Sequence, residues 1–203
     1  MAKPEATESA PFETESTLHR FLLVIHPHAA LTEQVEEWKD LLASHIGYFS
    51  GRHSIPHITL FVADLPGTLE AAVIKGITAG AVGHRSFALH YDGITHFPDR
   101  KTIYVAPVQK EAIAPVRSSV ACHVRSTIGS NEAVMVTNEP HLTIAAGLKA
   151  AQFDKAWDLL APHIHRSDQT VDELLLLRRE MRPGARYDVV QPFKLTAPEP
   201  TLF

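Results

Sequence analysis

Apolar and polar positions follow two spacings along this chain, and each spacing predicts one type of element. Short runs rich in β-branched and aromatic residues predict strands, whereas apolar side chains three or four residues apart predict helices. In the first half, strands are expected at residues 19–27, 54–65 and 86–98, and helices at residues 31–47 and 68–82. The second of these helices is expected in spite of Gly76 and Gly80. The first half therefore reads strand, helix, strand, helix, strand.

The second half repeats this order. Helices are expected at residues 109–128 and within residues 151–166, the latter at least to Leu160. Strands are expected at residues 101–108, 140–148, 171–180 and 186–196. The first of these strands should form a hairpin with residues 86–98. The repetition predicts one α+β domain over residues 18–203, built from two duplicated lobes, roughly 18–98 and 99–203, that are able to exchange strands. Chance alternation, which is common in α/β proteins, is the alternative.

One short motif occurs at a similar place in both halves. Residues 56–60 read PHITL and residues 140–144 read PHLTI. In an extended strand, residues two apart point to the same face. Each copy therefore presents a histidine beside a threonine, and turns the intervening apolar residue toward a core. The four side chains presented in this way are His57, Thr59, His141 and Thr143.

Two imidazoles and two hydroxyls suit chemistry at a phosphate. A neutral imidazole can take a proton from an attacking water, and a protonated one can deliver a proton to the departing oxygen. The hydroxyls can hold the non-bridging oxygens, and the scheme needs no metal. A cyclic phosphodiester fits well, because its leaving oxygen stays tethered. The chain has 13 histidines, so coincidence is the competing interpretation.

Composition narrows the partners. The net charge of −4 and the pI near 6.3 argue against extended nucleic-acid binding, but allow a small nucleotide or one strand end. No apolar run is long enough to span a membrane, so no membrane association is expected. Residues 1–17 are acidic and polar, unlike a signal peptide, and are expected to be a flexible tail. The single cysteine, Cys122, excludes an internal disulfide, is expected in the core, and fits a cytoplasmic location.

The doubled motif, together with FPDRKTIYVAPV (97–108) and the closing strands, resembles the 2H phosphoesterase superfamily, and in particular its 2′-5′ RNA ligase family. The resemblance runs from His19 to Leu195. It implies two mainly antiparallel sheets that face each other across a central cleft, with helices packed outside. It also implies metal-independent and cofactor-free chemistry on 2′,3′-cyclic or 2′-5′ phosphodiesters. By the same resemblance, His57 is the acid, His141 the base, and Thr59 and Thr143 hold the phosphate.

The chain departs from the family at one position. Members tend to carry an arginine shortly after the second motif, where this chain has Ala146. Either another cation serves the substrate phosphate, or the substrate differs. The cations considered for this role are Arg100, Lys101, Arg178 and Arg179. Candidates for stacking on a base are Tyr104, Tyr187 and Phe97, and core packing is the alternative for these aromatic residues. The pairs His26/His28 and His163/His165 lack a ligand partner at a recognisable spacing, so no metal site is expected.

The sequence thus predicts a monomeric hydrolase that opens 2′,3′-cyclic phosphates on RNA ends or small nucleotides by two-histidine acid–base catalysis. Ligation of 2′,3′-cyclic and 5′-hydroxyl ends is the same chemistry in reverse. A non-catalytic module that binds a nucleotide or an RNA end at the same place is the alternative, favoured by Ala146.

Overall fold

The computed structural model describes residues 17–196. The tail predicted for residues 1–17 lies outside the described residues, apart from Thr17. The helices are α1 (Ala29–Ile46), α2 (Glu70–Ala81), α3 (Lys110–Ile128) and α4 (Ala150–Leu160), and a 3-10 turn, η1 (Gly67–Leu69), precedes α2. The strands are β1 (Leu18–Ile25), β2 (Ile58–Pro66), β3 (Phe87–His96), β4 (Ile103–Pro107), β5 (Val134–Val136), β6 (Leu142–Ala145), β7 (Arg166–Val171), β8 (Glu173–Glu180) and β9 (Asp188–Lys194).

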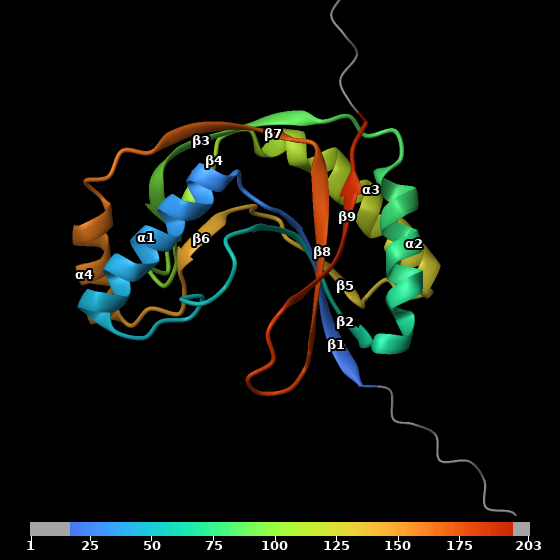
Figure 1. Cartoon of the computed structure of the whole chain (residues 1–203), viewed down its shortest axis with the longest axis horizontal. Coiled ribbons are helices and arrows are strands. Elements are labelled where there is room, and N and C mark those ends of the chain that lie inside the picture. The colour runs from blue at the N-terminus through green and yellow to red at the C-terminus, as the bar shows by residue number, and fades with distance from the viewer. Residues whose placement is uncertain (1–16, 197–203) are drawn as a thin grey trace, which may run out of the picture.

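The described strands form one curved antiparallel sheet. Its order is β7-β3-β4-β6-β2-β1-β8-β9, and β5 pairs with β2. Helices α1 and α4 pack together at one end of the sheet, and α2 and α3 pack together at the other (Figure 1). The α+β class is confirmed. The predicted pair of sheets is instead one continuous sheet, because β2 and β6 pair at its centre through Ile58 and Leu142.

The strand order reads as a palindrome around this central pair. Exchanging β2 with β6, β1 with β4, β3 with β8 and β7 with β9 gives the same order read from the opposite edge. Helix α1 follows β1 but packs on α4 and β6, while α3 follows β4 but packs on α2. Each end of the sheet is therefore built from both halves of the chain. We infer a duplication in which the two halves exchanged elements.

The two faces of the sheet differ. Phe21, Leu23 and Ile25 point into the main core with the helices, whereas Leu22 and Val24 join Leu177 in a small separate cluster on the other side. We call this second side the open face. Alternation along β1 puts successive residues on opposite faces, so both faces of one strand are apolar here.

Two glycines explain how α2 can lie so close to α3. A Cβ on Gly76 would stand 2.6 Å from Val124 Cα, and a Cβ on Gly80 would stand 2.5 Å from Val120 Cα. Real Cβ atoms do not approach that closely, so the hydrogen side chains are required at this contact. The residues that weakened the helix prediction are thus the ones that the packing needs.

Three features differ from the sequence-based expectations. Strands β5 and β7 were not predicted, because β5 has three residues and β7 is a polar strand at the edge of the sheet. The core position expected for Cys122 is wrong: this cysteine is exposed, since the buried face of α3 runs through Val116, Val120 and Val124.

Within residues 17–196, no helix combines the length and the apolar character that a membrane crossing requires.

Candidate active site

The two Pro-His motifs meet at the centre of the sheet. Ile58 and Leu142 are opposite each other and fully buried on the helix side. His57 and His141 immediately precede β2 and β6. From the Ile58–Leu142 pairing and strand alternation we infer that His57 stands opposite Thr143 and Thr59 opposite His141, on the open face. Directly opposed residues have Cβ atoms about 4.5–5.5 Å apart, and diagonal neighbours about 7–8 Å. This spacing makes the four side chains a candidate site for one phosphate group.

The backbone selects the same nitrogen on both histidines. His57 Nδ1 donates to the carbonyl oxygen of Ile55 at 2.6 Å, and His141 Nδ1 donates to that of Glu139 at 2.8 Å. A carbonyl can only accept, so Nδ1 carries the hydrogen in each ring. Nε2 is then the nitrogen that gains and loses a proton. Each imidazole can act as a base when neutral and as an acid when protonated.

The surroundings lower the pKa of both imidazoles. Burial is the main cause at His57, partly offset by the bond to Ile55, and the positive charges of Lys39, His141 and His26 lower this pKa further. At His141, burial again dominates and the nearby Lys110 adds to it. These surroundings therefore favour the neutral form of both histidines. A bound phosphate anion would favour the protonated form.

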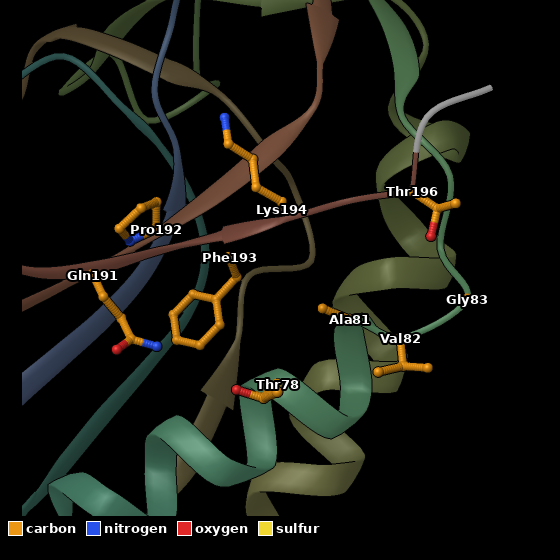
Figure 2. Close-up of a pocket in the computed structure, with 9 residues that line it drawn as sticks. All are labelled: Thr78, Ala81, Val82, Gly83, Gln191, Pro192, Phe193, Lys194 and Thr196. Atoms are coloured by element: carbon orange, nitrogen blue, oxygen red, sulfur yellow. The ribbon is translucent and has the colours of Figure 1, made fainter.

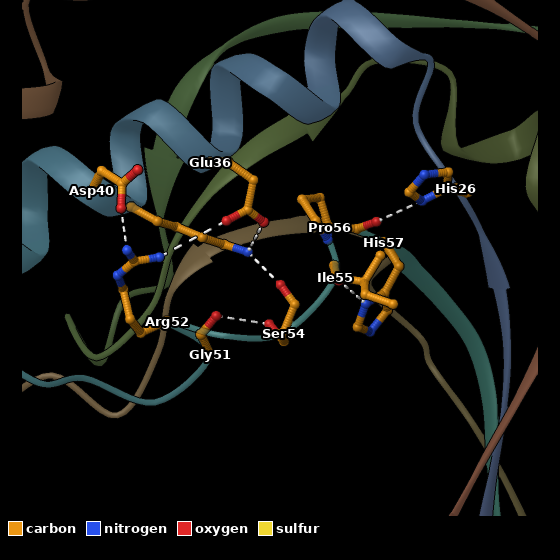
Figure 3. Close-up of polar contacts among 10 residues, drawn as sticks. His26, Glu36, Asp40, Gly51, Arg52, Ser54, Ile55, Pro56 and His57 are labelled. Carbon is orange, nitrogen blue, oxygen red and sulfur yellow. Dashed lines mark hydrogen bonds and ion pairs between the residues drawn. The ribbon is translucent and has the colours of Figure 1, made fainter. Parts of the chain in front are cut away.

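The segment before His57 is fixed by three consecutive carbonyl groups. The carbonyl of Ser54 accepts from Lys39 Nζ at 2.5 Å, that of Ile55 from His57, and that of Pro56 from His26 Nδ1 at 3.0 Å (Figure 3). Lys39 is fully buried and also bonds Glu36 at 2.9 Å. Its burial lowers its pKa, while Glu36 opposes the shift. These contacts hold the imidazole of His57 in one orientation.

Aromatic rings hold His141 instead. Its ring lies 5.3 Å from that of Tyr104 and 4.8 Å from that of Phe97, and these two rings are 4.6 Å apart. Tyr104 also lies opposite Thr143 on the neighbouring strand. Tyr104 is buried and packs against the histidine.

Two of the predicted substrate contacts lie away from the four central side chains. Arg100 forms an ion pair with Asp154 and lies over the ring of Phe153, on the side of α4. Arg178 pairs with Glu70 of α2 at 2.6 Å, on the helix side of the sheet. The structure does not bring either arginine to the histidines.

Arg179 and Tyr187 are on the open face, but farther along it. Tyr187 packs against the cluster of Leu22 and Leu177, and the Arg179 guanidinium lies 5.1 Å from the centre of its ring. The cation that acts on His141 is Lys110, which pairs with Glu139. Lys110 was not among the predicted site residues.

The histidine pairs considered for metal binding have other contacts. His28 caps α1 by accepting from the Leu31 amide, and His26 bonds Pro56. The rings of His163 and His165 both pack against Trp38. Among residues 17–196, no three His, Cys, Asp or Glu side chains are grouped as metal ligands would be.

A hollow of about 400 Å³ lies between the end of α2 and β9, away from the two motifs (Figure 2). It is lined by Thr78, Val82 and Phe193, among others, and its titratable side chain, Lys194, pairs with Glu173 at 2.6 Å. This hollow is therefore a gap between two packed elements and contains no acid–base pair.

The comparisons agree with the geometry. The profile of the 2′-5′ RNA ligase superfamily matches residues 27–182. The chain belongs to this superfamily. No curated protein sequence matches the chain.

Solved structures show the same fold. Escherichia coli LigT complexed with 3′-AMP is 17% identical, with a TM-score of 0.63 over 89% of this chain and 99% of that one. TT0787 of Thermus thermophilus is 15% identical, with a TM-score of 0.64 over 88% of this chain and 98% of that one. A structure described as a phosphoesterase is 16% identical, with a TM-score of 0.59 over 88% of this chain and 99% of that one.

Sequence reasoning missed the residues that support the histidines. For Lys39 a signal existed, since a lysine at helical spacing from Val35 and Leu42 lies on the buried face of α1. His26 was considered only as a metal ligand. Lys110 gave no signal, because only the fold brings the start of α3 close to His141.

Proposed function

We propose that this member of the 2′-5′ RNA ligase superfamily is a metal-independent phosphodiesterase that hydrolyses 2′,3′-cyclic phosphates. The observation that supports this most is the pairing of Ile58 with Leu142, which brings the two His-Thr motifs together at the centre of the sheet, with Nδ1–H of each histidine directed to the backbone. Acid and base can then stand on either side of one phosphorus atom, as in-line displacement requires.

The reaction uses both Nε2 atoms. Neutral His141 takes a proton from water as the water oxygen bonds to phosphorus, and protonated His57 donates its proton to the ribose oxygen as the P–O bond breaks. Thr59 and Thr143 donate hydrogen bonds to the non-bridging oxygens. The product is a nucleotide with a free hydroxyl and a phosphate monoester, and the proton taken from water replaces the one that was given. The anionic substrate raises the pKa of His57 when it binds, so the acid becomes protonated at the moment of use.

The structural relatives support a nucleotide substrate. LigT of Escherichia coli has been crystallised with 3′-AMP, with ATP and with NADP+. A nucleotide that ends in a phosphate also fits two histidines and two hydroxyls. Non-catalytic binding of a nucleotide or an RNA end is the second candidate, because Ala146 stands where members tend to carry an arginine.

A panel of 2′,3′-cyclic nucleotides tests the proposal. Replacing His57 or His141 by alanine should lower kcat by about 10²–10⁴-fold, since each removes one proton transfer. His123→Ala is the matched control, because it removes an exposed histidine of α3 that belongs to neither motif. Full turnover by either active-site variant would refute the roles. Binding of nucleotides by the wild type without turnover of any of them would support the second candidate.

A further inference from the structure

A large groove adjoins His57. It has a volume of about 580 Å³ and lies between the α1–β2 connection and the β8–β9 connection. Ile55 lines it, and the carbonyl group of Ile55 is the one that holds His57. A molecule bound at His57 can therefore extend into this groove.

The groove is basic in an acidic protein. Its charged and aromatic lining residues are Tyr48, Arg52, His53, Arg179, Arg186 and Tyr187. None of the described residues that line it is acidic, although the whole chain has a net charge of −4. Arg52 is neutralised from outside by Asp40 and Glu36, which leaves Arg179 and Arg186 as the charges available to a ligand.

Arg179 is held ready for a ligand. Its guanidinium lies against the Tyr187 ring, and its buried Nε has no hydrogen-bond partner among the described residues. The nearby carboxylate of Asp64 is occupied by both nitrogen contacts of Arg20, at 2.7 and 2.6 Å. Arg179 therefore has no ion-pair partner among residues 17–196, and its charge remains available to an anionic ligand.

Arg179 is too far along the sheet to serve the reacting phosphate. Thr59 of β2 pairs with Val24 of β1, and Val24 pairs with Leu175 of β8. Arg179 lies farther along β8, where it pairs with Arg20 of β1. The offset of four residues along β8 corresponds to about 13 Å. Arg179 therefore addresses a different group of the substrate, and the exposed ring of Tyr48 offers a surface on which a base can stack.

We propose that the groove is a subsite for a second phosphate and its adjoining base, so that the preferred substrate carries one further nucleotide beyond the 2′,3′-cyclic end. This rests on the proposed function for the reacting end. The subsite also explains how the chain can carry Ala146 where family members tend to carry an arginine. Part of the positive charge that holds the substrate then comes from Arg179 in the groove.

Two adjacent arginines supply the test and its control. A cyclic mononucleotide is compared with the dinucleotide that has the same cyclic end, using the wild type, Arg179→Gln and Arg178→Gln. The wild type should show a kcat/KM about 10-fold or more higher for the dinucleotide. Arg179→Gln should remove about 10- to 100-fold from the dinucleotide value, as the loss of a charge-assisted contact predicts, and change the mononucleotide value less than about threefold. Arg178→Gln should leave both values in place, since Arg178 contacts Glu70 on the other face.

Equal use of both substrates by the wild type, or an equal loss on both in Arg179→Gln, would overturn the subsite and leave the hydrolase proposal standing. Calorimetry with a dinucleotide that ends in a 3′-phosphate separates the two proposals further. If no cyclic substrate is turned over, the hydrolase proposal fails, yet about 10-fold weaker binding by Arg179→Gln would still support the subsite. Unchanged binding by Arg179→Gln would overturn it.

Discussion

Two backbone carbonyl groups decide which nitrogen of each candidate catalytic histidine can exchange protons. His57 and His141 each donate Nδ1–H to the carbonyl two residues earlier, so the same local turn has been built twice. The rest of each environment differs: His57 is supported by buried Lys39 and by His26, whereas His141 lies against Tyr104 and Phe97. The two imidazoles thus have the same orientation but different surroundings, which can give one histidine the role of acid and the other the role of base.

At the residue scale, Lys110 provides a test of the electrostatics. Its positive charge lowers the pKa of His141, so Lys110→Gln should raise that pKa. A base acts only when it is neutral, so activity should increase as the pH passes the pKa of His141. In Lys110→Gln this increase should occur at a higher pH. The acidic limb of the kcat/KM profile should move to higher pH, and NMR titration of the His141 ring should show the same direction.

Lys155→Gln is the control for Lys110→Gln, since it removes the same charge at an exposed position on α4. It should leave the His141 titration unchanged. A His141 pKa that falls, or stays the same, in Lys110→Gln would contradict the assigned cause.

At the scale of elements, the contact between α2 and α3 depends on two missing side chains. Gly→Ala in a helix normally stabilises by about 1 kcal/mol. At Gly80 the added Cβ would lie 2.5 Å from Val120 Cα, so the helices must separate. We expect Gly80→Ala to lower the free energy of unfolding by about 1–3 kcal/mol, measured by urea denaturation.

Thr78→Ala serves as the comparison for Gly80→Ala, because Thr78 is an exposed residue of α2 two positions earlier. It should be neutral or slightly stabilising, as helix propensity alone predicts. A stabilised Gly80→Ala variant would show that the two helices can move apart without cost.

At the scale of the whole molecule, one sheet crosses both halves of the chain. Each end contains elements from before and after the hairpin of β3 and β4, and the central pair joins the two ends. Neither half therefore has a core of its own. We expect a single cooperative unfolding transition.

The positions of the two tryptophans make this test sharp. Trp38 on α1 and Trp157 on α4 both report on the end of the sheet that is farther from α2. Tryptophan fluorescence and far-UV circular dichroism should give the same midpoint, and Gly80→Ala should shift both together. A fluorescence midpoint that ignores Gly80→Ala would mean that the two ends unfold separately.

The sequence by itself determined the order of most elements, the α+β class and the four residues of the doubled motif. These follow from local rules, because the spacing of apolar residues sets the element and the period of two sets the face. Because Arg178 and Arg179 are adjacent in a predicted strand, their side chains also lie on opposite faces by the same rule. The polar edge strand β7 and the short β5 escaped, since neither has an apolar pattern long enough to predict a strand.

Only the tertiary structure decided which side each arginine occupies, that the two sheets join as one, and that Lys39 and Lys110 act on the histidines. These outcomes depend on which distant elements pack together, and no local spacing encodes that. The pairing of Ile58 with Leu142 joins strands far apart in the chain, and it converts two separate His-Thr pairs into one candidate site.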